Sequence, residues 1–183
     1  MATSDEILHH ECGHIVMGYD RGFRVNRMRI DANGGVTEFD YGDNSIQCTV
    51  LNHLSKPQIF ESFGMLPSQV KPEVALNLLF MFIAGPIAEA IFRNDFDENG
   101  QMVYEESGTD LERSKNIYNF LKEHYAFNQS YTTILCKMIA LLKGSKFQNA
   151  ILSLVNKFNE TEGSCLSRSD IEDVMKEVGV LKK

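Results

Sequence analysis

The first twenty residues place apolar side chains at helical spacing. Thr3 and Glu6 have the spacing of a capping box, in which two side chains satisfy free backbone N–H groups at the start of a helix. We therefore predict a helix over 4–19. Gly18 and Gly22 are expected to mark its end, because glycine is common just past a helix C-terminus.

The next segment alternates apolar and polar residues, which is the period of a half-buried strand. The alternation covers 25–30 and returns over 36–39. Between the two runs, Asn33-Gly34-Gly35 is a turn sequence, so a β-hairpin is predicted directly after the first helix. A third strand is predicted over 45–51.

Beyond residue 70 the apolar positions follow helical spacing almost throughout. The predicted fold class is mainly α (α+β), with a small N-terminal β-sheet and a C-terminal helical bundle. A length of 183 residues fits one domain over 1–183. Ser167 and Ser169 are both able to cap the last helix. The predicted helices cover 72–93, 109–126, 130–143, 146–160 and 168–178.

One segment is apolar enough to raise the question of a membrane span. It runs over 74–92 and is about as long as a bilayer-crossing helix. Asn77, Pro86 and Glu89 interrupt it, and an ionisable group in lipid is costly. We therefore expect a buried core helix and no membrane span.

Charge and cysteine content narrow the class of partner. The formal net charge is −7, whereas nucleic acids and anionic membranes are bound by basic faces, so no nucleic-acid partner is expected. The four cysteines form no CxxC pair, which favours reduced thiols and a cytoplasmic location.

Residues 10–14 read HECGH and contain the pattern HExxH. On a helix, His10 and His14 share a face, so both imidazoles can reach one metal ion. Glu11 lies beside that face and is placed to take a proton from a water molecule activated by the ion. Two imidazoles and one oxygen ligand leave a zinc ion open to water, which is typical of catalytic zinc.

The third ligand must come from a distant part of the chain, and two carboxylates are candidates. Glu89 lies in the apolar helix, where a buried carboxylate needs a partner, so it is either a ligand or an acceptor for an imidazole N–H. Asp110 begins the next helix, where it would also interact favourably with the helix dipole. Cys12 is expected to pack behind the first helix, and His9 to face solvent or to support the site.

Three motifs together, HECGH, AGPIAEAIF and SGTDLERSKNI, resemble the zinc peptidase domain of the FtsH-type ATP-dependent metalloproteases. The segment FRVNRMRIDANGGVTEFD is similar to the strand pair that follows the active-site helix in that family. The segment AILSLVNKFNETEGSCLSRSDIEDVMKEV is similar to its C-terminal helical hairpin. The resemblance implies a zincin-like helical peptidase domain. It also implies Zn²⁺ bound by His10, His14 and Asp110, with Glu11 as the base and Glu89 as a supporting residue.

The resemblance also carries expectations about partners. It implies a polypeptide substrate and a homo-oligomer, since the family's protease domains form rings. The three motifs belong to the peptidase part of that family, and we expect no ATPase module in this chain. We therefore expect it to cut flexible or unfolded segments, or to work with a separate ATPase that unfolds substrates.

A second metal pattern lies over 95–106, which matches the calcium loop D-x-[DN]-x-[DN]-G-x5-E. Asp95, Asp97, Asn99 and Glu106 would be the ligands, with Gly100 at the sharp turn. The alternative is an acidic, solvated loop without an ion.

The sequence thus predicts a zinc metalloendopeptidase of the HExxH type. Its substrate is expected to lie extended along the strand over 36–39, pairing through main-chain hydrogen bonds. The alternative is a non-catalytic interaction module that keeps the zinc site as a scaffold. A calcium-binding protein that depends on the 95–106 loop is a third reading.

Overall fold

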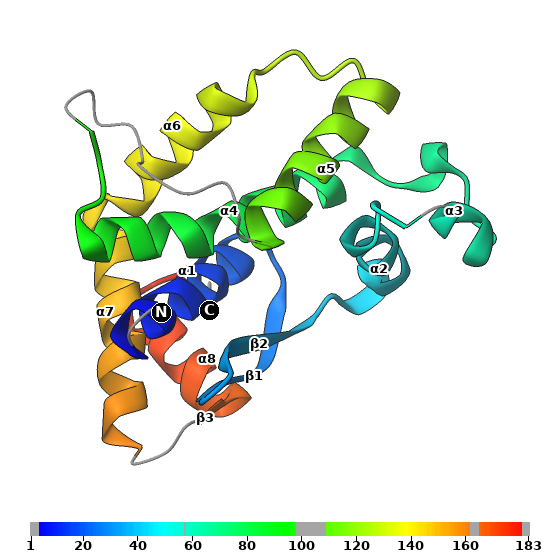
Figure 1. The fold of residues 1–183 in the computed structure, drawn as a ribbon. Helices are drawn as coiled ribbons and strands as arrows, with labels where there is room; N and C mark the ends of the chain where they lie inside the picture. Colours follow the sequence, from blue (N-terminus) through cyan, green and yellow to red (C-terminus); the bar gives the residue numbers. More distant parts are fainter. Residues whose placement is uncertain (1–3, 57, 98–108, 162–164, 181–183) are drawn as a thin grey trace.

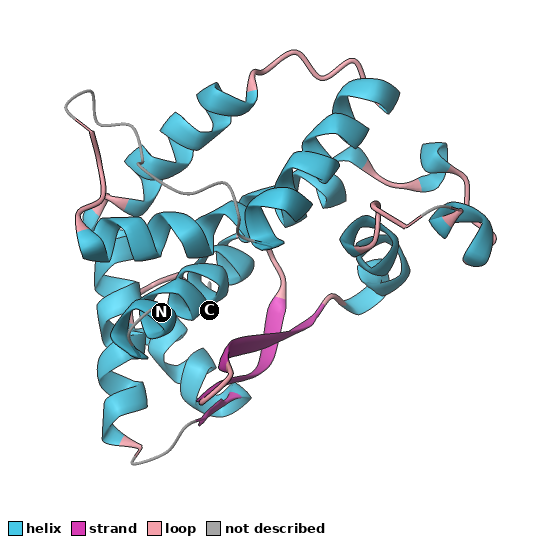
Figure 2. Cartoon of the chain, viewed as in Figure 1, coloured by secondary structure: helices cyan, strands magenta, loops and turns pink. Residues whose placement is uncertain are grey.

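The structure is a computed structural model that describes residues 4–56, 58–97, 109–161 and 165–180. Within these residues the chain is mainly helical, with a small antiparallel sheet (Figures 1 and 2). The predicted fold class is therefore confirmed. The elements, in chain order, are α1 (Ser4–Asp20), β1 (Arg24–Asp31), β2 (Gly34–Asp40), η1 (Gly42–Asn44), α2 (Ser45–Asn52), α3 (Ile59–Ser62), η2 (Pro67–Gln69), α4 (Pro72–Arg93), α5 (Thr109–His124), α6 (Tyr131–Leu142), α7 (Ser145–Glu160), β3 (Cys165–Ser167) and α8 (Arg168–Glu177).

Helix α1 lies at the centre of the fold, packed against α4, the β1–β2 hairpin and α7 (Figure 1). It crosses α4 at close range because Gly13 faces Ala84 and Ala88. A Cβ atom at position 13 would lie 2.6 Å from the Ala84 carbonyl oxygen and 2.6 Å from the Ala88 Cβ. Small residues on both helices therefore bring the two backbones together.

The sheet has the strand order β2-β1-β3, with antiparallel pairing throughout. Gly34, with a φ of +128°, begins β2 at the tight end of the hairpin, a conformation that favours glycine. Strand β3 was not predicted. It is three residues long and comes from the C-terminal part of the chain, so it shows no recognisable alternation. Strand β2 is consequently an edge strand.

The strand predicted over 45–51 is wrong, because this segment forms helix α2. Gly42, with a φ of +53°, turns the chain away from β2. Cys48 and Leu51, one helical turn apart, are both buried, and α2 contacts α4. Burial of one helical face therefore overrides the strand-like composition of this short segment.

The two glycines predicted at the end of the first helix differ in their positions. Gly22 follows α1 with a φ of +86°, as expected for a chain leaving a helix. Gly18, however, lies inside α1, and a Cβ atom there would lie 2.5 Å from the Phe39 ring. Gly18 therefore makes room for the hairpin and does not end the helix.

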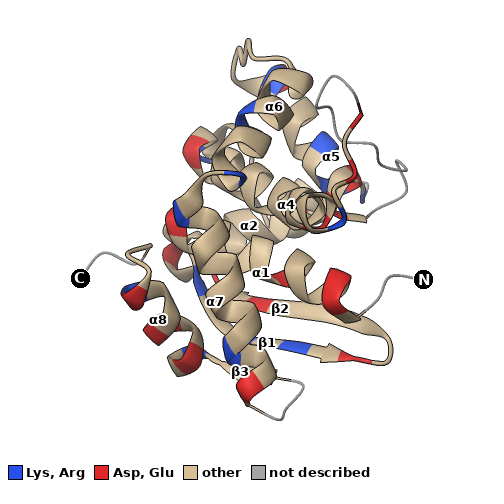
Figure 3. Cartoon of the chain, turned by 90° about the vertical axis from the view of Figure 1, so that its left-hand side faces the viewer, with Lys and Arg blue, Asp and Glu red and all other residues tan. Residues whose placement is uncertain are grey.

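Helix α4 is the most apolar element. Its 22 residues include an 18-residue window of mean hydropathy 1.9, enough by length and composition to cross a membrane, and 67% of that window is buried inside the structure. Its charged residues are few, Glu73, Glu89 and Arg93, whereas α8 carries mostly acidic residues on its outer side (Figure 3). The burial of α4 agrees with a core helix, and the absence of a membrane span remains an expectation.

Candidate metal centre and its pocket

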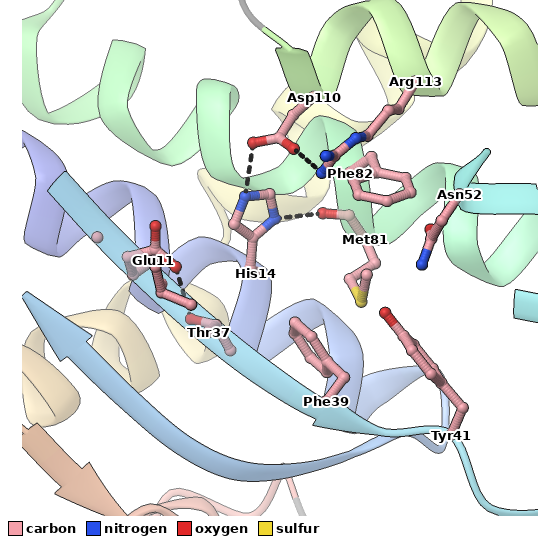
Figure 4. Close-up of a pocket in the computed structure, with 12 residues that line it drawn as sticks. Glu11, His14, Thr37, Phe39, Tyr41, Asn52, Met81, Phe82, Asp110 and Arg113 are labelled. Carbon is pink, nitrogen blue, oxygen red and sulfur yellow. Dashed lines mark hydrogen bonds and ion pairs between the residues drawn. The ribbon is translucent and has the colours of Figure 1, made fainter. Parts of the chain in front are cut away.

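Three predicted ligands lie together between α1, α4 and α5. His10 Nε2 and His14 Nε2 lie 3.1 Å apart, and Asp110 Oδ2 lies 3.1 Å from each of them. The two histidines come from successive turns of α1, and Asp110 comes from the first turn of α5. Figure 4 shows the Asp110 carboxylate above the His14 ring. The structure thus brings together residues about 100 positions apart in the sequence.

The spacing of these atoms fits a single metal ion. Ligands about 2.1 Å from one tetrahedral ion lie about 3.4 Å from each other. The observed separations of 3.1 Å are close to that value, and the three residues form a group that could hold a metal ion. No fourth protein ligand joins them within the described residues. One coordination position would therefore remain open to water or substrate.

The outer nitrogens of both rings are held by acceptors. His14 Nδ1 donates to the Met81 carbonyl oxygen at 2.8 Å, and His10 Nδ1 donates to Glu89 Oε2 at 2.9 Å. These bonds keep the proton on Nδ1 and direct the lone pair of each neutral ring toward Asp110. Three electron-rich atoms then face one another, an arrangement that requires a proton or a cation between them.

The pKa values indicate that a proton competes with a metal ion for the space between the three side chains. Burial by itself lowers the pKa of His10, but the hydrogen bonds to Asp110 and Glu89 outweigh it and raise the pKa to about 9. Burial raises the pKa of Asp110, but hydrogen bonds from both histidines hold it well below its usual range. The metal-free cluster therefore carries a proton on His10 at neutral pH, and metal binding would release it.

Glu11 is buried beside this cluster, on the side that faces β2 (Figure 4). Thr37 of β2 donates a hydrogen bond to Glu11 Oε2 at 2.6 Å. The carboxylate also lies against Gly35, where a Cβ atom would be 2.6 Å from Oε1 and 2.5 Å from Cγ. Strand β2 therefore positions Glu11 in two ways. The Thr37 hydroxyl group binds the carboxylate, and Gly35, which has no side chain, leaves room for it.

Gly85 of α4 also acts through its missing side chain, because it leaves room for the two histidine rings. A Cβ atom at this position would lie 2.4 Å from His14 Nε2 and 2.8 Å from His10 Nε2. Only glycine lets the α4 backbone lie this close to the two rings. No role in the site was predicted for Gly35, Thr37 or Gly85, and Gly35 was expected only as part of a turn. For Gly85, a glycine inside a long apolar helix was the available clue.

A pocket of about 250 Å³ opens from this cluster. Strand β2 forms one wall, and α4 and α5 form the other (Figure 4). Among the described residues β2 pairs only with β1, so its outer backbone edge is left for another partner. The residues that line the pocket are Glu11, His14, Gly35, Val36, Thr37, Phe39, Tyr41, Asn52, Met81, Phe82, Asp110 and Arg113.

Cys12, His9 and Glu89, the other residues considered near the metal site, lie around the cluster and not in it. Cys12 is fully buried, its pKa is raised by burial, and it packs behind the site as predicted. His9 stacks on Phe92, with ring centroids 4.0 Å apart, and takes no part in the cluster. Glu89 is the acceptor for His10, and it also accepts a hydrogen bond from Arg93 at 3.1 Å. Of the two carboxylates considered as third ligand, Asp110 therefore lies in the cluster and Glu89 supports it.

The proposed calcium loop lies mostly outside the described residues, including Asn99, Gly100 and Glu106. Of its first two positions, Asp95 accepts a hydrogen bond from Arg93 Nε at 2.6 Å. The four cysteines are free, as expected.

The comparisons with known proteins add no family assignment: no protein-family model matches the chain, and no curated protein matches it.

Proposed function

We propose that this chain is a zinc-dependent endopeptidase of the HExxH type, with flexible or unfolded polypeptides as substrates. The observation that carries the proposal is the convergence of His10, His14 and Asp110 within 3.1 Å of one another, with the Glu11 carboxylate beside them at the head of a pocket. The resemblance to the FtsH-type peptidase domain agrees with this assignment.

The donor set supports zinc as the metal. Two neutral imidazoles and one carboxylate suit zinc, whereas calcium and magnesium prefer oxygen ligands throughout. The hydrogen bonds to Met81 and Glu89 fix both ring orientations, as is usual for metal-ligating histidines. When bound, zinc polarises a carbonyl group and lowers the pKa of water toward about 7.

Glu11 is the group that accepts and returns the proton. Thr37 occupies Oε2, so Oε1 is the oxygen that exchanges a proton with the attacking water and then with the leaving amine. The burial of Glu11 excludes bulk water from this transfer. Thr37 is a positioning residue, because it acts through the carboxylate.

The edge strand β2 supports the placement of the substrate. An extended peptide can pair with its free backbone edge over Val36–Phe39 and pass directly over Glu11. A proline substitution at Thr37 or Glu38 would remove a main-chain donor or distort the strand. Cleavage that stays at the wild-type rate in both proline variants would refute this binding mode.

The proposal also includes the expected location and partners of the chain. These are a cytoplasmic location, a homo-oligomer, and cooperation with a separate ATPase that unfolds substrates.

The test combines metal analysis with cleavage. The purified chain should contain one zinc ion per molecule and should cut an unstructured protein such as casein. Glu11→Gln should retain zinc and lose cleavage, whereas Glu61→Gln, the same change at an exposed position, should retain both. A wild-type chain that holds zinc but cleaves none of many unstructured substrates would overturn the proposal and favour a zinc-holding interaction module.

A further inference from the structure

We propose that the pocket beside the ligand cluster selects a carboxylate of the bound peptide next to the scissile bond. Arg113 is the residue that recognises it, with Tyr41 and Asn52 as further donors. This inference rests on the proposed peptidase function and names its substrate preference.

The pocket has two chemically different ends. Glu11, His14 and Asp110 form the end at the metal centre. Tyr41 and Asn52 form the other end, and Arg113 lies between the two ends, with Nη1 3.6 Å from Asp110 Oδ1. Figure 4 shows Asn52 and Tyr41 directed toward one another across that end. The wall between the two ends is apolar and consists of Phe39, Met81 and Phe82.

Arg113 has donors to offer a ligand. One guanidinium nitrogen, Nη1, lies 3.6 Å from Asp110 Oδ1, and the group lies over the Phe82 ring at 5.6 Å from its centroid. The structure gives this guanidinium no hydrogen bond to the described residues, although it carries five N–H groups. The side chain is 49% exposed, so a carboxylate can approach it from the pocket.

The charge balance favours an anion at this end. The carboxylates of Glu11 and Asp110 lie at the metal end, and a bound divalent cation would neutralise Asp110. The positive charge of Arg113 would then be only partly balanced, by Asp110 Oδ1 at 3.6 Å. Glu112, the residue before it, lines a neighbouring hollow that Arg113 and Lys56 also line.

Tyr41 supplies a neutral donor beside Arg113. Its ring is held between Phe23 and Phe39, at centroid distances of 5.3 Å and 6.0 Å. Burial raises the pKa of the Tyr41 phenol to about 12, while Asn52 and Arg113 act in the opposite direction. The phenol therefore remains protonated and can donate to a carboxylate.

The size of the pocket and the cost of removing water from its polar groups disfavour other occupants. At about 250 Å³ the pocket is smaller than the roughly 300–1,000 Å³ of drug-sized ligand sites, so it takes one side chain or a chain terminus. An apolar side chain would cover the Arg113 guanidinium without offering it a hydrogen-bond acceptor, which is unfavourable. A basic side chain would be repelled by Arg113.

Peptide binding to the zinc-loaded Glu11→Gln variant separates recognition from catalysis. Labelled, amidated peptides would carry Glu, Gln, Lys or Phe at one central position, and their affinities would be measured by fluorescence anisotropy. The Glu peptide should bind about five- to tenfold more tightly than the Gln peptide, as expected for a partly exposed charge-assisted hydrogen bond. If instead a peptide with a free C-terminal carboxylate shows the larger increase in affinity, the pocket recognises the C-terminus of the peptide and not a side chain.

Arg113→Gln in the same background should abolish the preference, and Arg113→Lys should retain part of it. Arg168→Gln is the matched control, because Arg168 is 45% exposed and paired with a carboxylate but lies on α8. Zinc content is measured for each variant. An equal affinity for the Glu and Gln peptides, or a preference that survives Arg113→Gln, would refute the carboxylate pocket. Failure of every peptide to bind the zinc-loaded protein would contradict the peptidase function itself.

Discussion

A single methyl group on α4 should disable the metal centre. In Gly85→Ala the new Cβ atom would lie 2.4 Å from His14 Nε2, 2.6 Å from His14 Cε1 and 2.8 Å from His10 Nε2. Ordinary contact requires about 3.4 Å or more, so the His14 ring would have to move by about 1 Å. Metal–ligand distances tolerate only about 0.2 Å.

We therefore expect Gly85→Ala to weaken zinc binding by at least about 100-fold, the upper range of changes next to a metal site. Helix propensity acts in the opposite direction, since alanine favours a helix over glycine by about 1 kcal/mol. In the metal-free protein a shift of the His14 ring would cost its hydrogen bond to Met81, worth about 1 kcal/mol, so the stability of the protein should change much less than its zinc affinity. Affinity would be measured by competition with a chromophoric chelator, and folding by circular dichroism.

The control is Gly144→Ala, between α6 and α7 and far from the site in sequence. A Cβ atom there has one close neighbour, the Leu141 carbonyl oxygen at 3.0 Å, and the backbone φ of −65° suits alanine. It should leave zinc affinity unchanged. Wild-type zinc affinity in Gly85→Ala would show that α4 does not lie against the histidines as described.

Three further predictions concern the surroundings of the ligands. Thr37→Val should leave zinc content unchanged but lower kcat/KM about tenfold and alter its pH profile, because Glu11 loses its hydrogen bond, and Thr37→Ser should restore most of the rate; an unchanged pH profile and rate in Thr37→Val would contradict the positioning. Glu89→Gln should weaken zinc binding by about 10–100-fold by loosening His10, and equal affinity by chelator competition would remove Glu89 from the site. Because the pKa of His10 in the folded, metal-free protein is raised to about 9 from 6.5, its stabilising contribution is fully present below pH 6.5 and is lost as the pH rises through 9. The free energy of unfolding of chelator-treated protein should thus fall by up to about 3 kcal/mol between pH 6.5 and 9, as measured by urea denaturation, and a flat profile would contradict the raised pKa.

The metal centre was partly predictable because half of it is local. His10 and His14 are one turn apart, so helix geometry alone places them on one face, and HExxH can be read directly from the chain. The third ligand depends on how α5 packs against α1 and α4. The residues alone left Glu89 and Asp110 as alternatives, and only the resemblance favoured Asp110.

The pocket and its positioning residues depend on contacts between elements that are far apart in sequence. Thr37 and Gly35 matter because β2 lies along α1, and Gly85 matters because α4 lies across both histidines. Arg113 faces the pocket because it follows Asp110 by one turn of α5. Apart from Gly85, a glycine inside a long apolar helix, none of these residues has a sequence pattern that distinguishes it from an ordinary surface or helix residue.

Elements with a long or local pattern were predictable from the amino-acid pattern alone: the helices α1 and α4 to α8, the β1–β2 hairpin and the pair of histidines. Short segments depend on tertiary contacts. Residues 45–52 form a helix because their apolar face is buried on α4, and β3 exists because it can pair with β1. The physical reason is that periodicity acts within a segment, whereas burial and strand pairing require a partner that the chain supplies from elsewhere.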